Sequence, residues 1–362
     1  MKRTMVIAAS LMLFLSGCQM RITPEDAAKA NDIAGNTSDI EIITPDDEEY
    51  DEAGTGAYLT VTAGLDEDFD FYETANLFTG YDDETIENNS FISTWEFDGI
   101  EEWGQVLNTE TGTFMTNGSN GRVVSLSYVQ NTDENNIYKS LINTGRESGT
   151  AYNLFFLRER FPNSELEDYS SDEVLEDVKI YLESVGYEYR NVDIYAMDKE
   201  SLLAIQDEEG IYSPDGDAWD EDDECYLLRF EAVIEDYEVF DISNITCLSI
   251  IYSKEKGLMY FELPVLYGEI SAEEETELIA PSEIFQNLSG MAADLNIEGT
   301  KLEVAEVQSG YVAKRQQQFE DDTKGYLTPC YRILYQVTKA DGTVVPGEFI
   351  VDAVTGERVS WD

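Results

Sequence analysis

Residues 225–230 (CYLLRF) and 330–335 (CYRILY) are the two stretches on which the interpretation of the fold depends. Both open with Cys-Tyr and continue with apolar and aromatic residues, a composition that predicts a β-strand. Each stretch is followed by another strand, a turn ending in glycine and a further strand. The following strands are expected at 250–252 and 258–261 in the first case, with the turn ending in Gly257, and at 349–351 and 358–361 in the second, with the turn ending in Gly356. The same order of elements therefore occurs twice.

An amphipathic helix is predicted before each of these stretches. The first begins near Ser171, opens with Ser170 and Glu173 at capping-box spacing, and ends at Gly186. The second begins at Pro281, and its apolar residues follow those of the first at a constant offset of 110 positions. The two apolar faces are Val174, Leu175, Val178, Tyr181, Leu182 and Val185, and Ile284, Phe285, Leu288, Met291, Ala292 and Leu295. We expect each helix to lie across an antiparallel sheet of about four strands.

These patterns predict an α+β fold, with tandem helix-on-antiparallel-sheet repeats preceded by a mostly β N-terminal domain. The expected ranges are 1–17 for a lipoprotein signal peptide, 18–56 for an acidic disordered tether, 57–165 for the mostly β domain, 166–275 for the first repeat and 276–362 for the second. Within the mostly β domain, strands are expected at 58–62 and 151–158, and a hairpin at 113–129. The alternative to duplication is that two unrelated α+β stretches share generic amphipathic spacing.

The first eighteen residues predict export and lipidation. Lys2 and Arg3 precede an apolar run over 5–15 that is too short to cross a hydrocarbon core of about 30 Å as a helix. Residues 15–18 (LSGC) resemble the bacterial lipobox, which implies that Cys18 receives a diacylglycerol and becomes the mature N-terminus. We therefore expect a protein anchored at the outer face of the cytoplasmic membrane, of the Gram-positive type. The alternative is an ordinary signal peptide with an incidental cysteine.

The composition excludes several functions. The net charge is −54, and removal of Lys2 and Arg3 with the signal peptide changes it to −56. Such a field repels nucleic acid and anionic headgroups, so nucleic-acid binding is excluded and a tethered chain is held off the membrane surface. The sequence contains no histidine, which removes imidazole bases and the usual zinc ligands. No cofactor is expected.

Three cysteines remain once Cys18 is lipidated: Cys225, Cys247 and Cys330. An odd number cannot all pair within one chain, and none of them forms a C-x-x-C spacing. We expect small, buried, unpaired side chains, with a disulfide or redox role as the alternative.

Two motifs are considered as possible catalytic or metal sites. Ser253 and Lys256 have the S-x-x-K spacing of penicillin-recognising acylases, but they lie in a turn ending at Gly257, where the required helical geometry fails. The acidic run over 215–224 is interpreted as a solvated loop, although its oxygens are also a candidate calcium site. The calcium candidates are Asp215, Asp217, Asp220 and Asp222.

The C-terminal segment carries a family resemblance. Residues 326–332 (YLTPCYR) and 349–357 (FIVDAVTGE) resemble the strand start and the hairpin of the C-terminal module of YycH/YycI-type regulators and of PepSY domains. Similar endings are found in uncharacterised lipoproteins of Gram-positive bacteria. The resemblance implies an extracytoplasmic module that binds or restrains another protein.

These observations predict a lipid-anchored, extracytoplasmic binding or regulatory protein without catalytic activity. It would act on a membrane protein or peptide, through exposed sheet edges or faces. The alternative is a solute- or glycan-binding surface lipoprotein, with a cleft between the repeats lined by Tyr and Trp. A cell-wall hydrolase is a third hypothesis, and it requires a pocket with convergent carboxylates.

Overall fold

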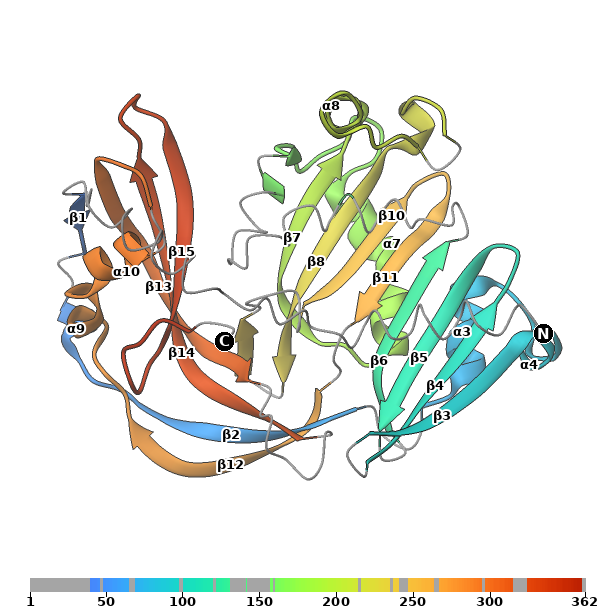
Figure 1. Ribbon diagram of the computed structural model, residues 1–362, viewed down its shortest axis with the longest axis horizontal. Coiled ribbons are helices and arrows are strands. Elements are labelled where there is room, and N and C mark those ends of the chain that lie inside the picture. The colour runs from blue at the N-terminus through green and yellow to red at the C-terminus, as the bar shows by residue number, and fades with distance from the viewer. Residues whose placement is uncertain are drawn as a thin grey trace, which may run out of the picture.

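Figure 1 shows the protein as a computed structural model. The structure describes residues 40–45, 48–64, 69–97, 100–119, 122–130, 141, 157–158, 160–213, 216–234, 237–240, 247–263, 267–294, 297–314 and 324–359.

The described residues form fifteen β-strands and six α-helices. The strands are β1 Glu41–Ile43, β2 Thr55–Ala63, β3 Ser90–Phe97, β4 Ile100–Asn108, β5 Gly112–Ser119, β6 Arg122–Gln130, β7 Tyr189–Met197, β8 Cys225–Ile234, β9 Tyr237–Phe240, β10 Leu248–Ser253, β11 Gly257–Leu263, β12 Tyr267–Glu277, β13 Lys301–Lys314, β14 Lys324–Thr338 and β15 Val344–Asp352. The helices are α3 Phe71–Thr79, α4 Asp83–Asn89, α7 Ser171–Ser184, α8 Lys199–Glu209, α9 Pro281–Phe285 and α10 Leu288–Asp294, with 3₁₀ turns η1 Glu48–Asp51 and η3 Glu221–Asp223.

All fifteen strands belong to one mixed sheet that is divided into two lobes. The strand order is β12-β2-β14-β13-β9-β8-β10-β11-β6-β5-β4-β3, and β1, β15 and β7 pair with β13, β14 and β8. The first lobe contains β3–β8, β10 and β11, and the second contains β1, β2 and β12–β15 (Figure 1). Among the strand pairs that the structure describes, β1–β13 and β9–β13 are parallel and the others are antiparallel.

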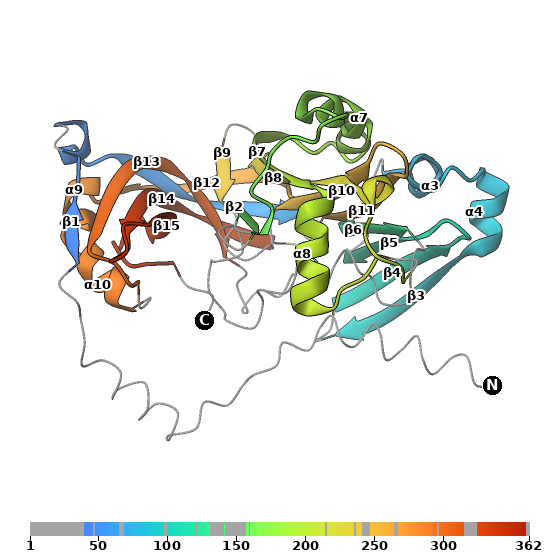
Figure 2. The same cartoon turned by 90° about the horizontal axis from the view of Figure 1, so that it is seen from above.

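Helices cover both faces of the first lobe (Figure 2). On one face, α3 and α7 pack over β5, β6, β8, β10 and β11. Phe78 of α3 lies at the centre of this core, with its ring centroid 5.1 Å from that of Tyr181 on α7 and 4.9 Å from that of Phe261 on β11. On the other face, Leu202 and Ile205 of α8 pack on β7, β8 and β10. Strand β8 is therefore buried from both sides.

In the second lobe, helices cover one face of the sheet. Helices α9 and α10 pack against alternate residues of β14, with Tyr331, Ile333 and Tyr335 among them. The opposite face of β14 carries Cys330 and Arg332, and it is turned toward the first lobe.

Strand β9 is the only described strand that links the two parts of the sheet, and we call this region the waist. Two residues of β9, Tyr237 and Glu238, pair with β8, and the next two, Val239 and Phe240, pair with β13. The waist is filled on one side by apolar residues of β2, β8, β9, β13 and β14. Four residues thus carry the backbone continuity between the lobes.

The prediction of tandem helix-on-antiparallel-sheet repeats is wrong. The chain is mostly β, and β6 of the expected N-terminal domain pairs with β11, so one sheet continues through both regions. The second expected helix is broken into α9 and α10, and β8 is covered by helices on both faces. Periodicity shows which face of an element is buried, but not which distant strand lies beside it.

Several local predictions are confirmed. Helix α7 begins after Ser170, whose side chain and that of Glu173 form the expected capping box. The hairpin over 113–129 is formed by β5 and β6, and residues 58–62 lie in β2. The strand expected at 151–158 lies mostly outside the described residues. Cys225, Cys247 and Cys330 are buried thiols that form no disulfide with one another, as predicted.

The structure differs from expectation in the last part of the predicted disordered tether. Strand β1 pairs in parallel with β13, and η1 places Tyr50 against Phe285 of α9 with ring centroids 5.8 Å apart. Strand β2 also belongs to the second lobe, where it pairs with β12 and β14. The apolar residues Ile40, Ile42 and Tyr50 explain the order of this segment, because they pack on the core under α9 and α10.

Candidate functional site

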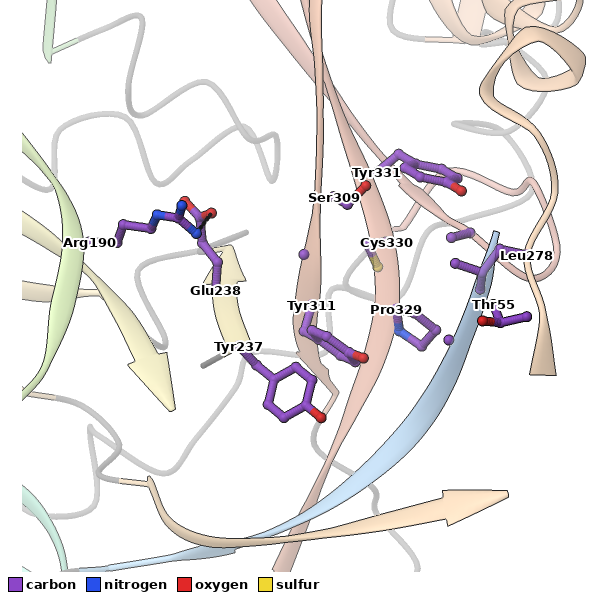
Figure 3. Close-up of a pocket in the computed structure, with 13 residues that line it drawn as sticks. Thr55, Arg190, Tyr237, Glu238, Leu278, Ser309, Tyr311, Pro329, Cys330 and Tyr331 are labelled. Atoms are coloured by element: carbon purple, nitrogen blue, oxygen red, sulfur yellow. Dashed lines mark ion pairs between the residues drawn. The ribbon is translucent and has the colours of Figure 1, made fainter. Parts of the chain in front are cut away.

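A pocket of about 230 Å³ lies at the waist and is the candidate functional site (Figure 3). Its lining comes from both lobes: Arg190, Tyr237 and Glu238 on one side, and residues of β2, β13, β14 and the β12–α9 connection on the other. Because β9 is short, the edge of β13 before Tyr311 is left without a β9 partner, and the pocket lies at that point.

Tyrosine rings form much of the pocket wall. The rings of Tyr237 and Tyr311 are 5.0 Å apart at an interplanar angle of 82°, an edge-to-face arrangement. Burial raises the pKa of Tyr311, and the neighbouring Tyr237 adds to the effect. Tyr331 lines the pocket from the adjacent strand β14. These side chains present flat apolar surface together with hydroxyl groups, which suits the binding of an amphipathic group.

Small residues keep the pocket open and the waist compact. A Cβ atom at Gly310 would lie 2.5 Å from the ring of Phe240 and 3.0 Å from the carbonyl oxygen of Glu238. Glycine is therefore required at this position for β9 to approach β13. Beside it, the exposed Ser309 adds a small hydroxyl group to the lining.

The polar rim of the pocket is a pair of opposite charges. Arg190 Nη1 lies 3.8 Å from Glu238 Oε2, and Asn191 Nδ2 donates a hydrogen bond of 2.5 Å to Glu238 Oε1. Glu238 is thus held in place by its neighbours, whereas the Arg190 side chain is exposed. Arg190 is therefore the member of this pair that is accessible to a polar or charged group of a ligand.

A buried ion cluster lies next to the pocket. The guanidinium of Arg332 on β14 donates hydrogen bonds to both carboxylate oxygens of Glu231 on β8, with Nη1 to Oε2 at 3.0 Å, and its Nε lies 3.6 Å from Glu348 Oε2. The guanidinium also stacks on Phe240, 4.1 Å from the ring centroid. This cluster joins the two lobes across the two intervening strands.

The pKa values in the cluster follow from burial and charge. Burial lowers the pKa of Arg332, but hydrogen bonding and the charge of Glu231 outweigh it, and the net pKa is raised. Burial raises the pKa of Glu348, and the positive charge of Arg332 opposes this shift only in part. The cluster therefore depends on the Arg332–Glu231 pair more than on Glu348.

The described candidate calcium residues, Asp217, Asp220 and Asp222, do not form a group that could hold a metal ion. Asp215 lies outside the described residues, and Asp220 Oδ1 accepts a hydrogen bond of 2.9 Å from the backbone N–H of Asp222 at the start of η3. Over the part of the chain that the structure describes, no group of three or more Cys, Asp or Glu side chains gathers in a way that could hold a metal ion. Calcium binding through Asp217 and its neighbours stays a prediction.

Ser253 and Lys256 form a turn, as expected from their position. Ser253 Oγ accepts hydrogen bonds from the backbone N–H groups of Glu255 and Lys256, at 3.3 and 3.5 Å. Lys256 Nζ is bound to Asp223 Oδ1 at 2.6 Å, so it faces a carboxylate and not the serine hydroxyl.

The predicted lipidation site, Cys18, lies outside the described residues. Of the helices that the structure describes, none combines the length and the apolar character needed to cross a membrane.

Sequence reasoning did not identify the pocket or the ion cluster. Cys330 and Tyr331 belong to the Cys-Tyr stretch that predicts a strand, and they also line the pocket. The sequence does contain one indication of the ion cluster. Glu231 and Arg332 are charged residues within stretches of apolar residues that are otherwise typical of a buried core. That signal shows that a partner is required, but it does not say which one.

Comparison with known proteins gives a fold relationship only. No protein-family model matches the chain, and no curated protein matches it. Among solved structures, the chain is similar to an uncharacterised protein from Eubacterium rectale, with a TM-score of 0.54 and 15% sequence identity. The similarity covers 89% of this chain and 90% of the other. The two chains thus share their overall architecture across both lobes.

Proposed function

We propose that this protein is displayed on the outer face of the cytoplasmic membrane through a lipid on Cys18, and that it binds a segment of a membrane protein or peptide without catalysing a reaction. One side chain of that segment would enter the pocket at the waist. The rest of the segment would lie across the rim formed by Arg190 and Glu238.

The observation that carries this proposal is the size of the pocket together with its tyrosine wall. Sites that enclose a whole small molecule have volumes of about 300–1,000 Å³. At about 230 Å³, this pocket suits one large side chain better than an entire solute. Tyr237 and Tyr311 offer rigid, amphipathic surface of the kind that binds peptide side chains at low cost in conformational entropy.

The chemistry around the pocket favours binding. Its polar groups are tyrosine, serine and threonine hydroxyls and an Arg190–Glu238 pair whose carboxylate is already held by Asn191. The net charge of −54 disfavours strongly acidic partners. The partner segment is therefore expected to be neutral or basic.

A glycan or solute ligand is the second candidate. It is favoured by one observation: Tyr237, Tyr311 and Tyr331 line the pocket, which supplies the tyrosines that this alternative expects, while no Trp is among the lining residues. Sugars stack on tyrosine rings in such positions, and a sugar chain could extend past the rim.

Site-specific photo-crosslinking of the full-length lipoprotein in its native host tests the proposal. A photoreactive residue replaces Ser309, which is exposed and lines the pocket, and the matched control places it at Tyr212, which is exposed in the first lobe. We expect one membrane-protein adduct from position 309 and none from position 212. A Cys18→Ala chain should lose the adduct.

Two variants at the same position sharpen the result. Ser309→Trp fills the pocket from its exposed rim and should reduce association with the captured protein at least tenfold, whereas Ser309→Ala should not. If position 309 gives no protein adduct while purified protein binds cell-wall oligosaccharides in a titration that Ser309→Trp abolishes, the glycan alternative replaces the proposal.

A further inference from the structure

The edge of β13 that faces away from β14 is occupied near both of its ends by short strands of this chain. At one end β1 pairs in parallel with residues 301–303, and toward the other end β9 pairs in parallel with residues 311–312. No strand that the structure describes pairs with residues 304–310 on this edge. Because β9 already lies against Gly310, the open stretch is 304–309, and we call it the β13 gap.

The β13 gap has room for one short, extended chain. Six residues of a strand span about 20 Å, at about 3.3 Å per residue. The bulge in the pairing with β14 lies between Val304 and Glu306, and the pairing is regular from Glu306 onward. The backbone groups on an open strand edge can form hydrogen bonds with an added strand. A folded sheet with a longer edge strand would collide with β1 and β9, so the gap admits a single peptide segment and excludes such a sheet.

The pocket at the waist lies at one end of the β13 gap. Ser309 belongs to both, and Figure 3 shows it on the same strand as Tyr311, with Tyr237 on the neighbouring strand β9. Alternate residues of a strand point to the same face, so Ser309 and Tyr311 share a face of β13. A chain paired along the gap therefore brings one of its side chains to the tyrosine wall while it keeps the strand conformation.

Glu306 gives the gap a negative charge. Its side chain is exposed, and its Oε1 accepts a hydrogen bond of 3.0 Å from Nε2 of the neutral Gln308. The nearby Glu303 is bound to Lys301 at 2.6 Å, whereas none of the ion pairs within the described residues includes Glu306. A basic residue of the added chain can therefore pair with Glu306.

We propose that the bound segment of the membrane protein or peptide adds to the sheet as a strand in the β13 gap. This inference rests on the proposed function and specifies its binding mode. The segment carries a basic residue beside Glu306 and a large side chain that enters the pocket beside Ser309, three positions away. Residues three apart on a strand point to opposite faces, as Glu306 and Ser309 do, so one extended chain can make both contacts.

Phage display of random twelve-residue peptides on the detergent-solubilised full-length protein supplies the probe. Peptides are selected on the wild type and counter-selected on Ser309→Trp, so that those retained depend on the pocket. We expect the retained peptides to share a basic residue three positions from a large aromatic or aliphatic residue. If no peptide is retained, the pocket does not bind peptides, and both this inference and the proposed function are wrong.

Methylation of the peptide backbone separates strand pairing from binding in the pocket alone. The nitrogens of the two residues between the basic and the large residue are methylated, so that whichever N–H faces β13 is lost as a donor. We expect calorimetric titrations to show at least tenfold weaker binding, and no change when a terminal residue outside this stretch is methylated instead. Unchanged affinity in the first case would overturn this inference and leave the proposed function standing.

Hydrogen exchange measured by mass spectrometry locates the bound strand. Amides of 304–309 that face the gap should exchange rapidly in the free protein and at least tenfold more slowly with the peptide bound. Slow exchange in the free protein would show that another part of the chain already covers the gap, and it would overturn the inference.

A pair of charge reversals tests the contact with Glu306. Glu306→Lys should weaken binding of the selected peptide at least fivefold. Glu183→Lys changes the net charge by the same amount at an exposed glutamate of α7, and it should leave the affinity unchanged. Equal effects of the two substitutions would contradict the placement of a basic residue beside Glu306. Circular dichroism confirms that each variant is folded.

Discussion

Strands β8 and β14 both contain a Cys-Tyr pair, at 225–226 and 330–331, but they occupy different places in the fold. In β8, helices α7 and α8 cover opposite faces, and nine of its ten residues are buried. In β14, helices cover one face, and the other face meets the opposite lobe through Arg332. Similar apolar sequences can therefore build either the centre of one lobe or the joint between two.

The difference predicts where each strand is sensitive to substitution. The stability that β8 contributes is spread over apolar contacts and over hydrogen bonds of Tyr226. The joint at β14 depends on one buried guanidinium and its bond to Glu231. Removing one partner of a buried ion pair leaves the other charge without compensation, which costs more than the intact pair contributes.

The largest effect is expected from Arg332→Ala. It leaves Glu231 and Glu348 facing each other at the joint between the lobes, and it should lower the free energy of unfolding by about 3–5 kcal/mol in urea titrations. Glu348→Gln is the matched control and should cost much less, because burial already raises the pKa of Glu348 and disfavours its charged form. Equal losses from the two substitutions would contradict the dominance of the Arg332–Glu231 pair.

The two tyrosines of the Cys-Tyr pairs give the next comparison. Tyr226 is fully buried, and its hydroxyl accepts from the Leu166 N–H at 2.8 Å and donates to the Tyr169 carbonyl at 2.5 Å. Tyr226→Phe leaves both groups without this partner and should cost about 1–3 kcal/mol by urea unfolding. For Tyr331, whose hydroxyl makes no hydrogen bond within the described residues, replacement by Phe should change stability by about 0.5 kcal/mol or less. A larger loss of stability from Tyr331→Phe than from Tyr226→Phe would contradict this prediction.

The third prediction concerns the thiol of Cys225. Burial raises its pKa to about 12, from an ordinary value of 9.0. The folded protein therefore holds this proton more tightly than the unfolded chain does. Below pH 9 the thiol is protonated in both states and does not change the free energy of unfolding. Between pH 9 and 12 it ionises mainly in the unfolded chain, so the free energy of unfolding falls as the pH rises. The loss should be about 1.4 kcal/mol for each pH unit in that window.

Unfolding titrations at several alkaline pH values, on the wild type and on Cys225→Ala, isolate this contribution, because the other titrating groups are common to both chains. The variant should show a flatter decline of stability with pH. Parallel curves for the two proteins would mean that Cys225 ionises as easily in the folded state as in the unfolded one.

Local structure was predictable wherever neighbouring residues determine it. The capping box of α7 and the hairpin of β5 and β6 depend on contacts within a few residues, and both were found from the sequence. Helix α8 was missed although its signals are present, since Asp198 caps its first turn and Gly210 ends it in the left-handed region. Its apolar face is short, with Leu202 and Ile205 as its large buried residues.

The candidate site could not be predicted in the same way. Tyr237 and Tyr311 are far apart in the sequence, and they meet only because β9 crosses from β8 to β13. The pairing of Glu231 with Arg332 spans 101 residues. Such contacts depend on how the strands are ordered in the sheet, which periodicity along the chain does not report.

By itself, the sequence determined the strong negative charge, the absence of histidine chemistry, the strand character of 225–230 and 330–335, and the positions of turns that require glycine. These properties follow from composition and from interactions within a few residues. Only the tertiary structure decided that the strands form one mixed sheet in two lobes, that β2 joins the second lobe, and that Arg332 connects the lobes. The physical reason is that an apolar strand can bury its side chains against any complementary surface. Which of these surfaces it contacts depends on the packing of the whole chain.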